Sequence, residues 1–243
     1  MEPTVVYVHG AFISDSAWWW RPTGDLLAKK GIVSRTVSLP SCGAAQPLGD
    51  LHADAGVVRN LLNEIGGPVI LVAHSYGGQV VTEAAVGQKN VRHLVYISAP
   101  VSDGKALGEC DFISDEKKAN PLAEIDIRDD GTAGEGQGRF KTKVIEAFPE
   151  PQMIREAISR LTRQSLAVFA QAPEGTAWRE IPSTYVVCLE DGDVAVPEQR
   201  KQAARTTYSV DVPTNHFPHI ERPDLIVDIL LDVIKKTQQN PVA

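Results

Sequence analysis

The stretch 69–78, Val-Ile-Leu-Val-Ala-His-Ser-Tyr-Gly-Gly, constrains the fold of this chain more than any other. Its first four residues form an apolar run that predicts a buried strand, and the residues from Gln79 to Ala85 predict a helix. A serine at such a junction is held on a sharp turn outside the sheet, and the small residues Ala73 and Gly77 permit that turn. A serine that merely caps the helix is the alternative. Strand, helix and double glycine together favour Ser75 as a nucleophile.

Composition limits the classes of protein to consider. A chain of 243 residues suits one large α/β domain or two small ones. Its net charge of -7 argues against a broad basic face for nucleic acid. Cys42, Cys110 and Cys188 are odd in number and widely spaced, so we expect neither a disulfide framework nor a zinc knuckle, and a reducing compartment fits best. Neither a signal peptide nor a membrane-spanning run is predicted, which favours a cytoplasmic protein.

Strand-like and helix-like segments alternate from the N-terminus to residue 98. Strands are expected at 4–9, 32–39, 69–72, 91–98, 184–189 and 208–212. Helices are expected to end near Lys30, Ile65, Ala85, Ala204 and Lys236. This alternation predicts an α/β fold with a mostly parallel sheet flanked by helices.

The alternation breaks in residues 103–180, which contain no clear strand run. Helical segments are expected near 151–163 and 164–170, and an independent small domain is the alternative, although an apolar core for it is lacking. We interpret the segment as a helical cap insertion above the carboxyl edge of the sheet. Residues 1–102 and 181–243 then form the core domain.

A serine hydroxyl needs a base that takes its proton, and in parallel sheets such a base is expected in a loop that follows a strand. His216 follows the last predicted strand and is the preferred base. His219, one turn further on, is the second candidate. The remaining histidines fall within predicted elements or in loops whose backbone is already committed: His9, His52, His74 and His93.

The acid that orients this base is expected after the strand at 184–189. Asp191 and Asp193 both lie there, within a Glu-Asp-Gly-Asp turn. Asp193 is preferred because it precedes Pro197 by four residues, where the loop re-enters a helix. Asp191 stays open as the rival, and a solvated turn aspartate is the alternative for either residue.

Four stretches carry a family resemblance: 9–11, 73–78, 193–197 and 216–223. With the chain order serine, aspartate, histidine, they make the chain resemble a cap-bearing member of the α/β-hydrolase superfamily over nearly its whole length. It is most similar to small esterases such as bacterial pyrethroid-hydrolysing esterases, plant methylesterases and hydroxynitrile lyases. The chain departs from this pattern at Ala73, where glycine is usual, and in an acid turn enlarged by two residues.

The resemblance implies a triad of Ser75, Asp193 and His216, with backbone N–H groups of Ala11 and Tyr76 as the oxyanion hole. It implies hydrolysis of an ester of a small hydrophobic molecule, without cofactor or metal. Lactonase, carbamate-hydrolase and carbon–carbon hydrolase activities share such a triad and remain open, as does a non-catalytic receptor of this fold. A homodimer also stays open, since nothing in the sequence specifies an interface.

Several motifs argue against other chemistries. The glycines after Gly134 do not complete a dinucleotide-binding pattern because Arg139 holds the last place, and no Walker lysine motif occurs. Phe217 follows His216 where hydroxynitrile lyases have lysine, so cyanohydrin cleavage is not expected. Apolar residues of the insertion could favour a hydrophobic substrate, although packing is the simpler explanation for most of them. They are Phe112, Phe140, Ile145, Phe148, Leu161, Leu166, Phe169 and Trp178.

Overall fold

The computed structural model describes residues 2–44, 46–114, 125–135, 148 and 150–239. Its main sheet has six strands in the order β2-β1-β3-β4-β8-β9, and every neighbouring pair is parallel. The strands are β1 (Thr4–Val8), β2 (Ser34–Val37), β3 (Val69–His74), β4 (Val91–Ile97), β8 (Ser183–Cys188) and β9 (Tyr208–Val212). The predicted α/β fold with a mostly parallel sheet is confirmed.

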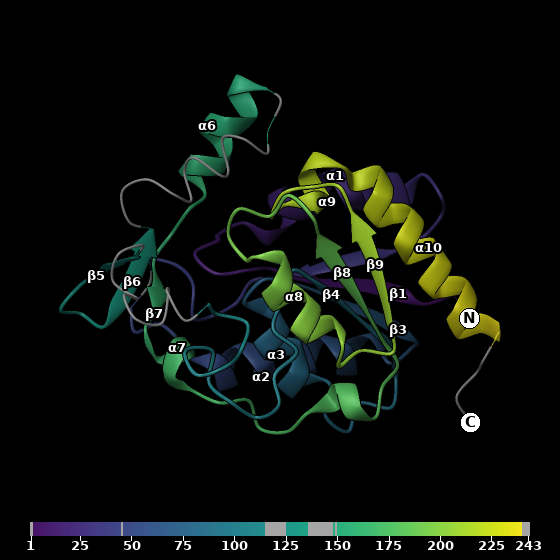
Figure 1. Ribbon diagram of the computed structural model, residues 1–243, viewed down its shortest axis with the longest axis horizontal. Coiled ribbons are helices and arrows are strands. Elements are labelled where there is room, and N and C mark those ends of the chain that lie inside the picture. The colour runs from purple at the N-terminus through teal and green to yellow at the C-terminus, as the bar shows by residue number, and fades with distance from the viewer. Residues whose placement is uncertain (1, 45, 115–124, 136–147, 149, 240–243) are drawn as a thin grey trace.

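Helices cover both faces of this sheet (Figure 1). One face carries α1 (Ser16–Ala28), α9 (Pro218–Glu221) and α10 (Pro223–Gln239). The opposite face carries α2 (Leu51–Ile65), α3 (Gly77–Ala84) and α8 (Val196–Ala203). In each crossover the helix carries the chain back to the edge at which the strands begin. The loops that follow the strands therefore gather at the opposite, carboxyl edge of the sheet.

Each central strand feeds two separate cores. In β1, Val6 and Val8 pack with α2 and α3, whereas Val5 and Tyr7 pack with α1 and α10. All four side chains are fully buried. Because both faces of the strand are covered, its sequence is apolar throughout and does not alternate.

Helix α2 shows how local sequence sets the element boundaries. The Asp50 carboxylate accepts a hydrogen bond from the Ala53 amide at 2.9 Å and caps the first turn. Gly66 ends the helix in the left-handed conformation with φ of 62°, as its position after the apolar pattern predicts. This helix carries the buried Asp54, which accepts a hydrogen bond from the hydroxyl of Tyr76, the residue after Ser75.

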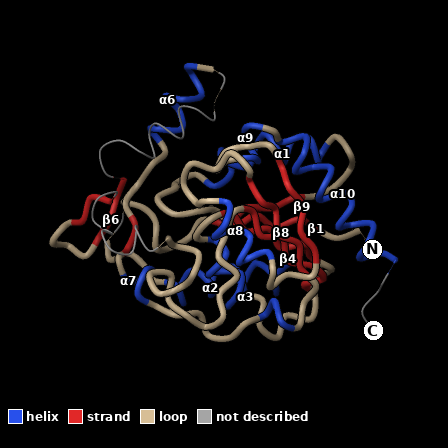
Figure 2. Tube along the Cα trace, in the orientation of Figure 1, coloured by secondary structure: helices blue, strands red, loops and turns tan. Residues whose placement is uncertain are grey.

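The segment between β4 and β8 contains strands, which contradicts the expectation that it holds none. They are β5 (Ile125–Ile127), β6 (Thr132–Glu135) and β7 (Gln164–Ser165), and they form a separate three-stranded sheet (Figure 2). These strands have two to four residues each and are largely polar, which is too short for periodicity to reveal them. The same segment includes α6 (Pro151–Ser159), α7 (Ala167–Ala170) and the 3-10 helix η2 (Ala177–Arg179). Phe140 and Ile145 lie outside the described residues.

Two backbone bridges join this segment between β4 and β8, called the cap below, to loops of the main sheet. Ile13 pairs with Leu161 and Cys42 pairs with Gln164, both in antiparallel fashion. The chain from 160 to 165 therefore lies against the loops that follow β1 and β2. Among the described residues, no helix combines the length and the apolar character needed to cross a membrane.

Candidate active site

Ser75 lies on the turn between β3 and α3 in a left-handed conformation, with φ of 49°. Its amide donates to the Ile97 carbonyl at 3.2 Å, and its own carbonyl accepts from the Gly78 amide at 2.9 Å. A left-handed non-glycine residue is strained, and such strain persists only where the surroundings enforce it. The residue is half-buried and lies at the carboxyl edge of the sheet, directly after β3.

The glycines around Ser75 are required by close backbone approach. A Cβ added at Gly77 would lie 2.8 Å from the carbonyl oxygens of both Val8 and His9. A Cβ at Gly78 would overlap the Pro100 carbonyl oxygen. The turn is therefore wedged between the ends of β1 and β4, and only glycine fits at these positions.

The imidazole of His216 is held by Asp191. Its Nδ1 lies 2.8 Å from Asp191 Oδ2, and both side chains are almost completely buried. The Ser98 hydroxyl also donates to Oδ2, at 2.6 Å, and the amides of Asp193 and Val194 donate to Oδ1. Burial raises the pKa of Asp191, but His216 and these donors outweigh it, so the net pKa lies below the ordinary value. The carboxylate is thus ionised at neutral pH and favours an Nδ1–H tautomer of His216.

The preference for Asp193 at this position is corrected by the geometry. Asp193 Oδ2 lies 3.7 Å from the other ring nitrogen of His216, Nε2, and 26% of its side chain is exposed. The reason is local: Asp191 uses its own carboxylate to cap the turn amides, which points Asp191 inward and Asp193 toward the open side. Asp191, the rival residue, makes the contact with His216 Nδ1 that was expected of Asp193.

The two residues expected to form the oxyanion hole border the same turn. Tyr76 immediately precedes α3 and is buried. Ala11 follows Gly10, at which an added Cβ would lie 3.0 Å from the Ser75 Cβ. The next amide, that of Phe12, donates to the side chain of Gln164 at 3.2 Å. The loop after β1 therefore runs beside the turn at Ser75, with Gly10 packed against Ser75 and Ala11 next along the chain.

Two buried histidines, His74 and His219, pack next to the turn at Ser75. His74 Nε2 donates to the His216 carbonyl oxygen at 2.8 Å, and its ring centroid lies 4.7 Å from that of His219. His219 in turn stacks on Trp20 at 4.2 Å. Burial lowers the pKa of His219 to about 3 and that of His74 well below its ordinary value. His219, the second candidate for the base, is instead a neutral packing residue.

Comparison with known protein families identifies the family of this chain. The model of the alpha/beta hydrolase family matches residues 5–229.

The chain belongs to the alpha/beta hydrolase family. The alpha/beta hydrolase nvfD of Aspergillus novofumigatus is 28% identical, with 95% of this chain and 96% of that protein covered. A pyrethroid hydrolase of Sphingobium faniae superposes with a TM-score of 0.80 at 20% identity, covering 98% of this chain and 99% of the other. Polyneuridine aldehyde esterase superposes with a TM-score of 0.75 at 16% identity, covering 96% and 99%. The family match supports a hydrolase, and the two solved structures have the same fold.

Sequence reasoning missed two residues of this hydrolase site. Ser98, at the end of β4, and Gln199, on α8, both donate to the Asp191 carboxylate. Ser98 is also left-handed, with φ of 40°. A serine directly after a buried strand was a usable signal, because it lies at the same sheet edge as the nucleophile. No pattern in the sequence marked Gln199, because its contact with Asp191 depends on how α8 packs.

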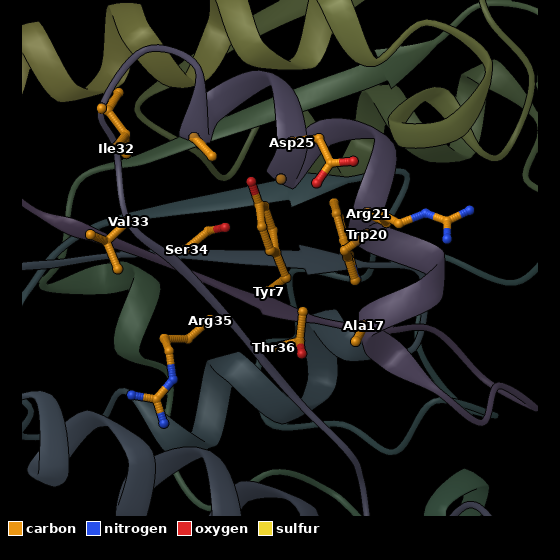
Figure 3. A pocket seen from close by; sticks show the side chains of 13 residues that line it. Tyr7, Ala17, Trp20, Arg21, Asp25, Ile32, Val33, Ser34, Arg35 and Thr36 are labelled. Atoms are coloured by element: carbon orange, nitrogen blue, oxygen red, sulfur yellow. The ribbon is translucent and has the colours of Figure 1, made fainter.

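Two other features lie apart from the site. A cavity of about 610 Å³ lies between α1 and the edge strand β2 and is lined by Tyr7, Trp20 and Ser34 among others; no candidate catalytic residue lines it (Figure 3). Among the described residues, His52, Glu83 and Glu174 could offer ligand atoms to a metal ion. However, Glu83 already accepts from His52 and from the Glu174 amide, which satisfies the group without one.

Proposed function

We propose that this protein is a serine hydrolase that cleaves an ester of a small hydrophobic molecule through an acyl-enzyme. The observation that carries the proposal is the buried pair of Asp191 and His216 beside a strained serine turn. A buried, ionised carboxylate on Nδ1 fixes the tautomer in which Nε2 can accept a proton, which is what a serine nucleophile requires.

The reaction would proceed in two halves. His216 Nε2 takes the proton of Ser75 as its Oγ attacks the ester carbonyl, and the resulting oxyanion accepts hydrogen bonds from the amides of Ala11 and Tyr76. The imidazolium then protonates the leaving alcohol as the carbon–oxygen bond breaks. A water molecule repeats the sequence on the acyl-enzyme, releases the acid and restores Ser75. Asp191 stabilises the imidazolium in both halves.

Hydrophobic side chains in and beside the loop that follows β1, called the oxyanion loop here, support an apolar substrate. The ring of Phe12 lies 6.0 Å from that of Phe169, which is half-buried, and Leu161 is half-buried next to Ile13. Phe112 and Phe148 are buried members of the two main cores and serve packing, whereas Phe169 and Leu161 pack against these cores and stay partly exposed. Phe12, Leu161 and Phe169 are therefore the residues we assign to contact with the acyl or alcohol group.

Labelling with a fluorophosphonate, followed by intact-mass spectrometry and peptide mapping, tests the proposal. We expect one adduct on Ser75 and turnover of p-nitrophenyl esters, both lost in Ser75→Ala. Wild-type protein that neither forms the adduct nor hydrolyses any ester of a chain-length series would contradict it and would favour a non-catalytic receptor.

A further inference from the structure

A chain of buried hydrogen bonds connects the two sides of the expected oxyanion hole. It begins at the Phe12 amide, which donates to Gln164 Oε1 at 3.2 Å. Gln164 Nε2 donates to Ser41 Oγ at 3.0 Å, and Ser41 Oγ donates to Asp54 Oδ2 at 2.5 Å. The Tyr76 hydroxyl donates to the same carboxylate oxygen at 2.7 Å. The side chains of all four residues beyond Phe12 are buried.

The carboxylate of Asp54 determines which group donates and which accepts in every hydrogen bond of this series. Burial raises the pKa of Asp54 to about 6, so the group is mainly ionised at neutral pH and only accepts hydrogen bonds. Tyr76 and Ser41 must therefore both donate to it. Since the Ser41 proton is committed, its oxygen accepts from the Gln164 amide nitrogen, and this turns the Gln164 oxygen toward the Phe12 amide. One set of donors and acceptors satisfies the whole chain.

The two ends of this series of hydrogen bonds lie at the residues that must position the oxyanion donors. Tyr76 is one expected oxyanion donor, and Phe12 follows the other, Ala11. Phe12 is left-handed, with φ of 59°, and its carbonyl accepts from the Thr162 amide at 2.8 Å. The cap therefore holds both polar groups of a strained residue, which fixes the peptide plane between Ala11 and Phe12.

We propose that Gln164 and Asp54 are positioning residues that hold Ala11 and Tyr76 at a fixed separation, so that seating of the cap strand β7 completes the oxyanion hole. This inference rests on the proposed serine-hydrolase function. It assigns the cap a part in stabilising the transition state, beyond covering the substrate.

A matched pair of glutamines separates this role from general stability. Gln164→Ala removes two hydrogen bonds that join the cap segment to the oxyanion loop and to Ser41. Gln171→Ala also removes two bonds: Gln171 accepts from the Leu51 amide at 2.9 Å and donates to Asp50 at 3.0 Å. These two bonds involve neither the loop that follows β1 nor Tyr76. We compare both variants for hydrolysis of p-nitrophenyl butyrate and for inhibition by a trifluoromethyl ketone, whose bound form presents an oxyanion.

In Gln164→Ala we expect kcat to fall by about 10- to 100-fold with KM changed by less than about threefold, because a misplaced donor weakens the transition state selectively. The inhibition constant of the ketone should rise in proportion. Gln171→Ala should change each quantity by less than about threefold. Equal behaviour of the two variants, with wild-type activity intact, would overturn the inference alone. A wild-type protein without turnover or fluorophosphonate adduct would overturn the proposed function as well.

Tyr76→Phe provides a second test should Gln164→Ala not fold. It removes only the hydroxyl at the other end of the chain, and we expect kcat to fall several-fold with an equal rise in the ketone's inhibition constant. In the double variant the losses should be less than multiplicative, because both changes break one connected network. An unchanged Tyr76→Phe, or fully multiplicative losses, would contradict a continuous chain.

Discussion

Two loops border the candidate nucleophile, and they are held in different ways. The turn at Ser75 is fixed by its neighbours in the core: the Ile97 carbonyl and the ends of β1 and β4. The loop at Phe12 is fixed from the cap, by residues 160–164. Both contain left-handed non-glycine residues. The strain is the same in kind, but one loop is stabilised by the sheet and the other by an insertion, so the two should fail under different perturbations.

The largest expected effect belongs to the core-held turn. Ser75→Ala should lower kcat by about 10⁵- to 10⁶-fold, as the loss of a triad nucleophile does. The free energy of unfolding should change little, because the residue is only half-buried and the substitution removes a single oxygen atom. Steady-state kinetics and urea unfolding measure the two quantities. Activity within tenfold of wild type would remove Ser75 from the mechanism.

A second test compares the two aspartates of the acid turn, which is also held by the core. Asp191→Asn should lower kcat by about 10⁴-fold, because an amide cannot hold His216 in the required tautomer. Asp193→Asn, which leaves the Nδ1 contact intact, should cost about tenfold or less. Initial rates on one p-nitrophenyl ester decide between them. The reverse ranking would return the acid role to Asp193.

The cap-held loop should be more sensitive to a change on the cap. The Arg160 guanidinium donates to Asp15 at 3.0 Å and lies over the Trp18 ring, so Arg160→Ala should lower kcat by about three- to tenfold. Arg200→Ala is the matched control, since Arg200 pairs with Asp211 on the core surface. It should leave kcat unchanged. Equal losses in both variants would show that the loop does not depend on the cap.

The last test measures folding stability instead of catalysis and concerns acid sensitivity next to the core-held turn. The folded pKa of His219 is about 3, below its unfolded value of about 6.5, so the unfolded state binds the additional proton between these pH values. Stability is therefore full above about pH 6.5 and is lost as the pH falls toward 3. His219→Phe keeps a ring on Trp20 and should reduce the slope of unfolding free energy against pH by up to about 1.4 kcal/mol per pH unit. Urea titrations from pH 4 to 7 measure it, and an unchanged slope would contradict the assignment.

What the sequence could predict follows the same division. The turn at Ser75 was predictable because its apolar strand, glycines and helix are contiguous. The aspartate that contacts His216 Nδ1 is Asp191 and not the preferred Asp193. Both residues follow β8, and the choice depends on which carboxylate caps the turn amides. The contact of Phe12 with Gln164 was out of reach, since 152 positions separate the residues and β7 has only two. Contacts made across such distances in the chain leave no local pattern.

Trp18 gives the molecule an optical reporter at the seam between cap and core. Its indole Nε1 donates to Glu156 on α6 at 2.9 Å, while its ring meets that of Trp19 edge-on at 5.3 Å. Arg160 lies 4.7 Å above the same ring. Trp18 and Trp19 both lie on α1, whereas Glu156 belongs to the cap. When the cap detaches, Trp18 loses its hydrogen bond to Glu156, and we expect its fluorescence emission and near-ultraviolet circular dichroism to change. Detachment of the cap can therefore be followed in real time, with no attached dye and without substrate.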